Sequence, residues 1–172
     1  MEKNLPQEIS VRTAQPEDAL QMHHVHVTSV HILCASDYTS EQIEAWVGFL
    51  DPEKRRHNMI QACDSEIIFV AEDKLGTIVG FSSLGVNEVN AVYVHPQYTR
   101  MGVGTLLLNA VETEAMAQNM KKLQLSASIT AVPFYQARGY RVIEHSFHTL
   151  RSAVKIKCVS MEKSLESEVN PR

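Results

Sequence analysis

The sequence is poor in cysteine and has no long hydrophobic run. Its three cysteines, Cys34, Cys63 and Cys158, show no paired spacing, which is typical of proteins kept in a reducing compartment. No stretch approaches the roughly 18 consecutive apolar residues of a membrane span, and residues 1–13 are too polar for a secretion signal. The formal net charge of −4 offers no basis for a nucleic-acid surface. We therefore expect a cytoplasmic protein that binds neither a membrane nor nucleic acid.

In other respects the amino-acid composition is ordinary for one globular domain. The 172 residues are 44% hydrophobic and 21% charged, and they contain no internal repeat. A chain of this length can bury a substantial core. We expect a single domain over residues 1–172, with a frayed tail over residues 164–172.

Turn and cap signals divide the chain into strands that alternate with helices. Pro16 followed by two acidic residues is a helix start, Thr39 with Gln42 forms a capping box, and Gly139 is placed as a left-handed helix cap. The expected helices cover residues 17–34, 39–49, 53–63, 102–118 and 130–138, and the expected strands cover residues 9–12, 66–72, 78–84, 88–94, 123–126, 140–144 and 154–161. Strands interleaved with helices predict an α/β or mixed α+β fold.

Residues 88–107 carry the strongest functional signal. A short apolar run ends before Pro96, and a turn containing Gly102 and Gly104 then leads into a run with helical period. Backbone N–H groups at a helix N-terminus are unpaired and carry partial positive charge, and glycine lets an anion approach them closely. The pattern predicts a phosphate-binding turn, although an ordinary loop before a helix would show the same glycines.

Two well-known phosphate-binding motifs fit these glycines poorly. A dinucleotide fingerprint needs a third glycine where Leu107 stands, and it places its first glycine almost directly after the strand. A P-loop needs a lysine after its last glycine, whereas Thr105 follows Gly104. Dinucleotides and nucleoside triphosphates are therefore poor candidates for the ligand.

The same residues resemble the acetyl-CoA signature of the GNAT superfamily of N-acetyltransferases. The order of strand, His-Pro, Arg-x-Gly-x-Gly and Leu-Leu matches over residues 88–107, with Thr99 where the family usually has Gln or Arg. Residues 126–140 resemble the closing motif of the family, with Ser128 where Asn is common. The matching positions of this second motif are Ala131, Phe134, Tyr135, Gly139 and Tyr140. The resemblance implies the GNAT fold over residues 9–163, with a central mixed, mostly antiparallel sheet of about seven strands flanked by four or five helices.

By this resemblance the chain takes acetyl-CoA as a co-substrate and acetylates a primary amine of a small molecule or protein. Tyr135 occupies the general-acid position of the family, and Glu88 the position of the catalytic glutamate in its histone-acetylating branch. GNAT proteins are often dimers, so a homodimer is also expected. A non-catalytic module that binds acyl-CoA on the same fold is the alternative. The coenzyme-binding residues implied are Val92, Tyr93, Val94, Thr99, Arg100, Met101, Gly102, Val103, Gly104, Thr105, Ser128, Phe134 and Tyr135.

The chemistry of acyl transfer explains why the site needs a base, an acid and a hydrogen-bond donor for the oxyanion. An alkylammonium must lose a proton before it attacks, which costs about 4.6 kcal/mol at pH 7. The leaving thiolate needs an acid such as Tyr135, and the oxyanion needs a donor, which the resemblance places at the backbone N–H of Val92 or Val94. Glu88 lies about 13 Å along the strand from Val92, so a water relay suits it better than direct contact. Asn90 shares their face by strand alternation and could orient that water.

Histidines gather in the first expected helix. His23, His24, His26 and His31 are spaced so that pairs of them could share a helix face. No cysteine or carboxylate completes a metal site at ligand spacing, so we expect no metal. In the family the first two helices form the acceptor side, and one or two of the histidines could contact the acceptor.

Overall fold

The computed structural model describes residues 8–48 and 51–166, and this part of the chain forms seven strands, five helices and three short 3-10 turns. The strands are β1 (Ser10–Thr13), β2 (Ile67–Glu72), β3 (Ile78–Leu84), β4 (Val89–Val94), β5 (Lys122–Ser128), β6 (Arg141–Thr149) and β7 (Lys155–Ser164). The helices are α1 (Ala19–Leu33), α2 (Ser40–Val47), α3 (Pro52–Cys63), α4 (Val103–Ala117) and α5 (Val132–Gln136), and the 3-10 turns are η1 (Pro16–Asp18), η2 (Pro96–Tyr98) and η3 (Ile129–Ala131).

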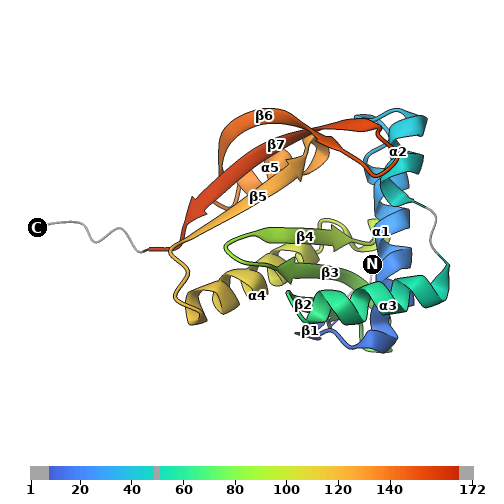
Figure 1. The fold of residues 1–172 in the computed structure, drawn as a ribbon. Helices are drawn as coiled ribbons and strands as arrows, with labels where there is room; N and C mark the ends of the chain where they lie inside the picture. The colour runs from blue at the N-terminus through green and yellow to red at the C-terminus, as the bar shows by residue number, and fades with distance from the viewer. Residues whose placement is uncertain (1–7, 49–50, 167–172) are drawn as a thin grey trace, which may run out of the picture.

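The strands form two antiparallel sheets that meet at one point. The order is β1-β2-β3-β4 in the first sheet and β5-β7-β6 in the second. A parallel bridge between Glu88 and Gln124 connects the sheets near the start of β4 and β5, and the two strands diverge beyond it (Figure 1). The predicted mixed, mostly antiparallel fold is confirmed, with the sheet split between its fourth and fifth strands.

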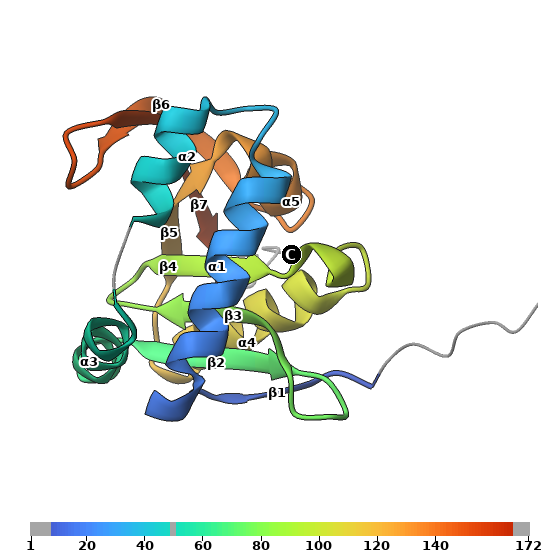
Figure 2. The same ribbon diagram turned by 90° about the vertical axis from the view of Figure 1, so that its right-hand side faces the viewer.

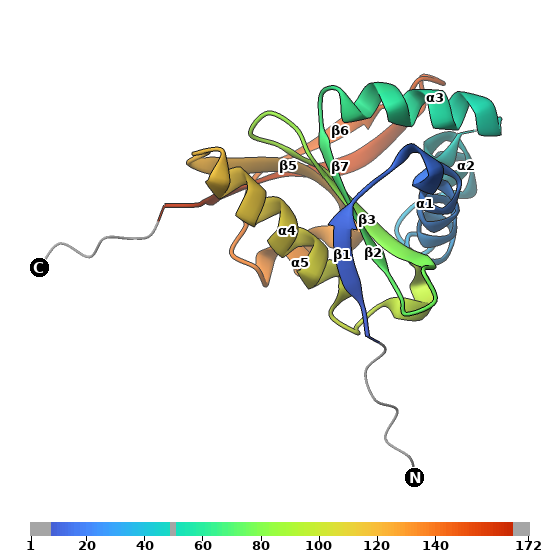
Figure 3. The same cartoon turned by 90° about the horizontal axis from the view of Figure 1, so that it is seen from below.

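Helices cover both faces of the first sheet (Figures 2 and 3). On one face, Val25 of α1 packs in a buried cluster with Ile68 of β2. On the other face, Leu107 of α4 packs with Ala71 of β2 and Val79 of β3. Because successive side chains of a strand point to opposite faces, β2 contributes to both clusters.

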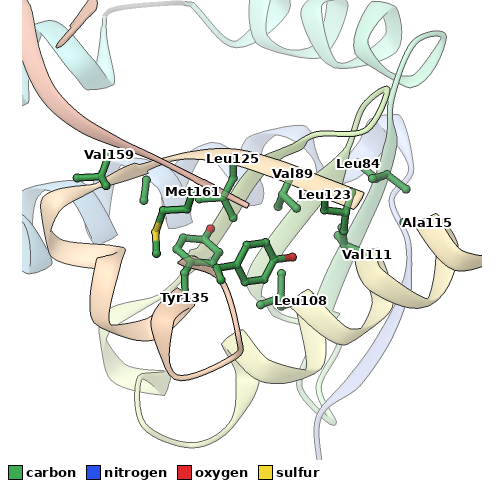
Figure 4. Packing of buried hydrophobic residues seen from close by; sticks show 12 residues of the cluster. Leu84, Val89, Leu108, Val111, Ala115, Leu123, Leu125, Tyr135, Val159 and Met161 are labelled. Atoms are coloured by element: carbon green, nitrogen blue, oxygen red, sulfur yellow. The ribbon is translucent and has the colours of Figure 1, made fainter. Parts of the chain in front are cut away.

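The largest buried cluster joins α4 to the second sheet (Figure 4). Leu108 and Val111 of α4 pack there with Leu123 of β5 and Met161 of β7. Tyr135 of α5 belongs to the same cluster, so the short helix is fixed against both α4 and the sheet.

A β-bulge interrupts the pairing of β4 with β3. Leu84 pairs with Val89 and Ser83 pairs with Ala91, which leaves Asn90 as the extra residue. A bulge bends its strand and increases the local twist. The bulge therefore lies where β4 begins to turn away from β5.

The bulge also breaks the alternation of side chains along β4. Val89 and Val92 both pack against the large cluster although they are three residues apart. Glu88, next to Val89, therefore does not share the face of Val92, and the prediction that it does was wrong because a single extra residue reverses the alternation.

The capping box and the left-handed glycine that the sequence predicted are confirmed. The Thr39 side chain accepts a hydrogen bond from the Gln42 N–H, and the Gln42 side chain accepts one from the Thr39 N–H, so the capping box opens α2. Gly139, after α5, has a φ of +89°, in the left-handed region. No helix in the described part of the chain is long and apolar enough to cross a membrane.

The end of the chain is ordered further than predicted. β6 and β7 pair as a long hairpin that extends to Thr149 and Lys155, so both strands exceed their predicted lengths. The predicted tail begins with Ser164, which is still part of β7 and pairs with Lys122. Residues 167–172 of that tail, like the predicted helix end at Phe49, lie outside the described residues.

Leu107 and Leu106 offer a matched test of the core. Leu107 is 0% exposed and Leu106, its neighbour in α4, is 42% exposed. We expect Leu107→Ala to lower the free energy of unfolding by about 2–5 kcal/mol because it leaves a cavity between α4 and the sheet. Leu106→Ala should lower it by less than about 1 kcal/mol. Urea denaturation of both variants measures this, and equal losses would contradict the packing described.

Candidate functional site

A cleft of about 420 Å³ opens where β4 and β5 diverge. It is lined by β4, the end of β5, the turn before α4, helix α5, and one side of α1 and α2. Most residues predicted to bind the coenzyme lie together in this lining: Val92, Tyr93, Val94, Thr99, Arg100, Gly102, Gly104, Thr105, Ser128, Phe134 and Tyr135.

Met101 and Val103 were predicted with this group but do not line the cleft. Met101 is 48% exposed, and the Val103 side chain is 1% exposed in the core between α4 and the first sheet. Val103 can therefore contribute only its backbone to a ligand.

The two glycines of the turn have different roles. Gly102 caps α4 with a φ of +85°, a left-handed conformation that favours glycine. At Gly104 an added Cβ would lie 3.0 and 3.2 Å from two ring carbons of Phe134. Glycine is thus needed at the first position for its backbone and at the second because the Phe134 ring occupies the space.

In the described part of the chain, the backbone N–H groups of the first turn of α4 have no hydrogen-bond partner, and this turn lies at the end of the cleft formed by Gly102 and Gly104. Leu106 is the first residue whose N–H closes a helical bond, to the Gly102 carbonyl at 3.0 Å. The N–H groups of residues 103–105 precede it, as expected at a helix N-terminus, and they favour an anion.

Arg138 adds a fixed positive charge beside this turn. Its guanidinium stacks on the Phe134 ring, 4.0 Å from the centroid. Its Nη1 donates to the Phe134 carbonyl at 3.0 Å and its Nε donates to the Thr105 hydroxyl at 3.1 Å. Arg138 lines the cleft, so the guanidinium is held in place before any ligand binds.

Tyr135 lies deeper in the cleft and is 6% exposed. Its ring makes edge contacts with Phe134 and Tyr140, with centroids 5.1 and 5.5 Å apart. Among the described residues none forms a hydrogen bond with its hydroxyl. Burial, and to a smaller extent the nearby Tyr93, raise the pKa of Tyr135, so the phenol stays protonated and can donate.

Among the described residues, no strand pairs with the edge of β4 that faces the cleft. His95 donates its N–H to Val79 of β3 at 2.8 Å. Because N–H groups alternate in direction along a strand, those of Val92 and Val94 point away from β3, toward the gap. This places two donors along one wall of the cleft.

Glu88 is exposed and lies outside the lining, at the bridge where the two sheets meet. Asn90 does line the cleft, and its amide lies over Gly85, where an added Cβ would be 2.7 Å from the amide nitrogen. The structure thus brings Asn90 into the cleft and leaves Glu88 at its closed end.

The wall opposite α4 comes from α1 and α2. Ser29, Leu33 and Cys34 line it from α1 and its C-terminal cap, and Trp46 lines it from α2. The Tyr38 hydroxyl donates to the Lys157 carbonyl at 2.7 Å and accepts from the Ile129 N–H at 2.9 Å, which ties this wall to the second sheet.

The resemblance placed the first two helices on the acceptor side, but the sequence did not predict the residues that line this wall, nor Arg138. The closing motif offered a signal for Arg138, which stands one helical turn after Phe134 and directly before Gly139. Trp46 and Cys34 offered none, because only the folded chain brings α1 and α2 to the edge of β4.

None of the four histidines of the first helix lines the cleft. His24 stacks on His95, with centroids 5.8 Å apart, and His31 bonds Glu44 at 2.7 Å. His26 packs against Tyr93, with centroids 4.7 Å apart. In the described residues, no three His, Cys, Asp or Glu side chains are grouped to hold a metal ion.

Comparison with known proteins shows the family. The model of the acetyltransferase (GNAT) domain matches residues 34–165. The chain is 30% identical to a GCN5-related N-acetyltransferase from Rhodopseudomonas palustris, with a TM-score of 0.84 and coverage of 95% of this chain and 99% of that one. The chain therefore belongs to the GNAT acetyltransferase family, as the resemblance predicted, and family membership indicates acyltransferase activity.

Two further relatives extend the comparison. The Escherichia coli protein YafP, described as an uncharacterized N-acetyltransferase, is 27% identical over 145 residues, which cover 84% of this chain and 89% of YafP. The PaiA N-acetyltransferase of Thermoplasma acidophilum, solved in complex with coenzyme A, shares the fold at 22% identity, with a TM-score of 0.71 and coverage of 91% of this chain and 99% of that one.

His26 should make stability depend on pH. Burial lowers the pKa of His26 to about 4, below the value of about 6.5 in an unfolded chain. Between these values the unfolded state binds more protons, so stability falls as the pH drops from about 6.5 to about 4, by up to about 3 kcal/mol. His26→Phe keeps a ring against Tyr93 and should remove this part of the loss.

The measurement is urea denaturation at several pH values between 7 and 4.5 for the wild type, His26→Phe and His57→Phe. His57→Phe, at an exposed position of α3, is the control and should follow the wild type. Parallel curves for His26→Phe and wild type would contradict the assignment.

Proposed function

We propose that the chain transfers the acetyl group of acetyl-CoA to a primary amine of a small molecule or protein, by direct attack in a ternary complex. The observation that carries this proposal is the order of groups along one cleft. Anion donors and Arg138 stand at one end, and the edge of β4 that faces the cleft follows. Tyr135 lies near Tyr93, which packs against the α1–α2 wall. A phosphate, an amide-containing arm, a thioester and an amine would meet these groups in that order.

The phosphate end suits the diphosphate of coenzyme A. The N–H groups of the first turn of α4 favour an anion, and Arg138 presents a positioned guanidinium. The pantetheine arm carries amides that can pair with the edge of β4, as an added strand does. The coenzyme A complex of the PaiA neighbour supports this assignment of the cleft.

The chemistry that we propose follows from the middle of the cleft. The neutral amine attacks the thioester carbon and forms a C–N bond, and the oxyanion accepts hydrogen bonds from the N–H of Val92 or Val94. When the intermediate collapses, the C–S bond breaks and Tyr135 gives its proton to the thiolate. The extra proton on the nitrogen then passes to the Tyr135 phenolate, so the amide is neutral and the phenol is restored. Ser128 and Thr99 complete the proposed coenzyme contacts, although Ser128 already accepts from the Ala131 N–H at 3.2 Å and Thr99 donates to the Pro96 carbonyl at 2.8 Å. Met101 stays a predicted contact, although it lies outside the lining of the cleft.

The alternative is a module that binds acyl-CoA without turning it over. The departures from the family motif at Thr99 and Ser128 favour it. Glu88 as the base, a homodimer and a cytoplasmic location stay predictions. Glu88 could act only through water, because it lies outside the lining of the cleft.

An acetyl-CoA assay read by thiol release tests the proposal, over polyamines, aminoglycosides, amino acids and peptides. Thermal unfolding with and without acetyl-CoA is measured in parallel. We expect stabilisation by acetyl-CoA together with amine-dependent thiol release. Stabilisation without turnover on any amine would favour the binding module, and protection by NAD or ATP but not by coenzyme A would contradict both functions.

Tyr135→Phe tests the acid. Loss of the hydroxyl should lower kcat by about 100-fold, while KM for acetyl-CoA changes by less than about threefold, because the proton is needed only in the transition state. Tyr140→Phe is the control: its ring packs on Tyr135, but its hydroxyl donates to Glu112 at 3.0 Å, away from the cleft. An unchanged kcat in the Tyr135 variant would remove it from the mechanism.

A further inference from the structure

Amine acetylation needs a path for a proton out of the cleft. An ammonium acceptor must lose one proton before it attacks, at a cost set by the distance of its pKa from the pH. Within the described part of the chain, no Asp, Glu or His side chain lines the cleft. The proton must therefore leave through a hydroxyl, a thiol or water.

Two hydroxyls of the lining donate to a carboxylate. Tyr98 donates to Asp73 Oδ2 at 3.2 Å, and Thr130 donates to Asp37 Oδ2 at 2.6 Å. Tyr98 precedes Thr99 and Arg100 at the phosphate end. Among the hydrogen bonds of the described residues, only the one between Thr130 and Asp37 joins a hydroxyl of the lining to a carboxylate at the acceptor end of the cleft.

Thr130 lines the same cleft as the proposed acid, Tyr135. It lies in η3, between Ser128 at the end of β5 and Tyr135 in α5, and all three line the cleft. Its hydroxyl also lies beside the Cys34 thiol, whose pKa is raised by burial and lowered to a smaller extent by Thr130. Asp37, on the other side of the hydroxyl, is exposed to solvent.

We propose that Thr130 and Asp37 form the proton exit for the acceptor amine. An N–H bond of the ammonium breaks as its proton passes to the Thr130 hydroxyl oxygen, while the original hydroxyl proton passes to Asp37. The exposed carboxyl then releases that proton to bulk water, so the amine is left neutral and both side chains return to their starting states. The Asp37 carboxylate also attracts the ammonium to this end of the cleft. This inference rests on the proposed acetylation of an amine.

Four substitutions and one test of the rival base distinguish a proton path from a purely structural hydrogen bond that holds the α1–α2 loop against η3. Asp37→Asn keeps an acceptor for the Thr130 hydroxyl and removes the basic carboxylate. Thr130→Val removes the hydroxyl, and Thr130→Ser restores it. Asp73→Asn is the matched control, because it changes the other hydroxyl–carboxylate pair, and Glu88→Gln tests the rival base.

The measurement is kcat/KM between pH 6.5 and 9.5 for each alkylamine that the wild type acetylates, with aniline as an acceptor that is already neutral at pH 7. Asp37→Asn and Thr130→Val should lower kcat/KM at pH 7 by about tenfold to a hundredfold. The loss should shrink to less than about threefold as the pH nears the pKa of the amine. Thr130→Ser and Asp73→Asn should follow the wild type, and stabilisation by acetyl-CoA should be unchanged in all variants.

The outcomes distinguish this inference from the proposed function. A wild type that acetylates no amine overturns both. If the wild type is active and the Asp37→Asn variant is unaffected, the proton exit alone is overturned. A loss of kcat/KM that is equal at every pH also overturns it, because a purely structural role would give that result. A pH-dependent loss in Glu88→Gln without one in Asp37→Asn would assign the path to Glu88. If aniline is acetylated, its kcat/KM with the Asp37→Asn variant should stay within about threefold of the wild-type value, because no proton has to leave before attack. A larger loss would also contradict the path.

Discussion

The separation of β4 from β5 is the constraint on which the site depends. The two strands share a single bridge, between Glu88 and Gln124, and then part. Beyond the bridge the N–H groups of β4 on that side have no strand to pair with, and an unpaired strand edge is a ready template for an extended ligand. Had the strands stayed paired, the backbone donors would be consumed by the ladder, and no cleft would form between the sheets.

Contacts on both sides of the gap keep the sheets apart. On one side, the Tyr38 hydroxyl bridges the Lys157 carbonyl and the Ile129 N–H, so the α1–α2 wall is fixed to the second sheet. On the other side, Leu108 of α4 and Tyr135 of α5 share the large buried cluster with β5 and β7. The cleft therefore lies between two packed layers, which makes it a pre-formed site and not a gap opened by a ligand.

The sequence predicted those features that have a local cause. The capping box at Thr39, the left-handed glycine at Gly139 and the alternation of strands and helices each follow from a few neighbouring residues. The resemblance of the two motifs then predicted the fold and eleven of the residues that line the cleft. The bulge at Asn90 has no such local signal, since it depends on the register with β3, and it reverses the face on which Glu88 was expected. The resemblance placed the first two helices on the acceptor side, but lining residues such as Cys34 and Trp46 were missed for the same reason, because they become part of the site only through tertiary packing.

Helix α5 couples the two ends of the cleft. Phe134 fills the space above Gly104 and supports Arg138 at the phosphate end, whereas Tyr135, the next residue, points its ring into the cluster beside the proposed thioester. Adjacent helical residues point in directions about 100° apart, so Phe134 of this short helix can support the Arg138 cation while Tyr135 presents its phenol elsewhere in the cleft. A shift of Phe134 caused by a larger residue at Gly104 would thus move the proposed acid as well as the cation. The glycine turn therefore helps to position Tyr135 through Phe134, in addition to the proposed contact of the turn with phosphate.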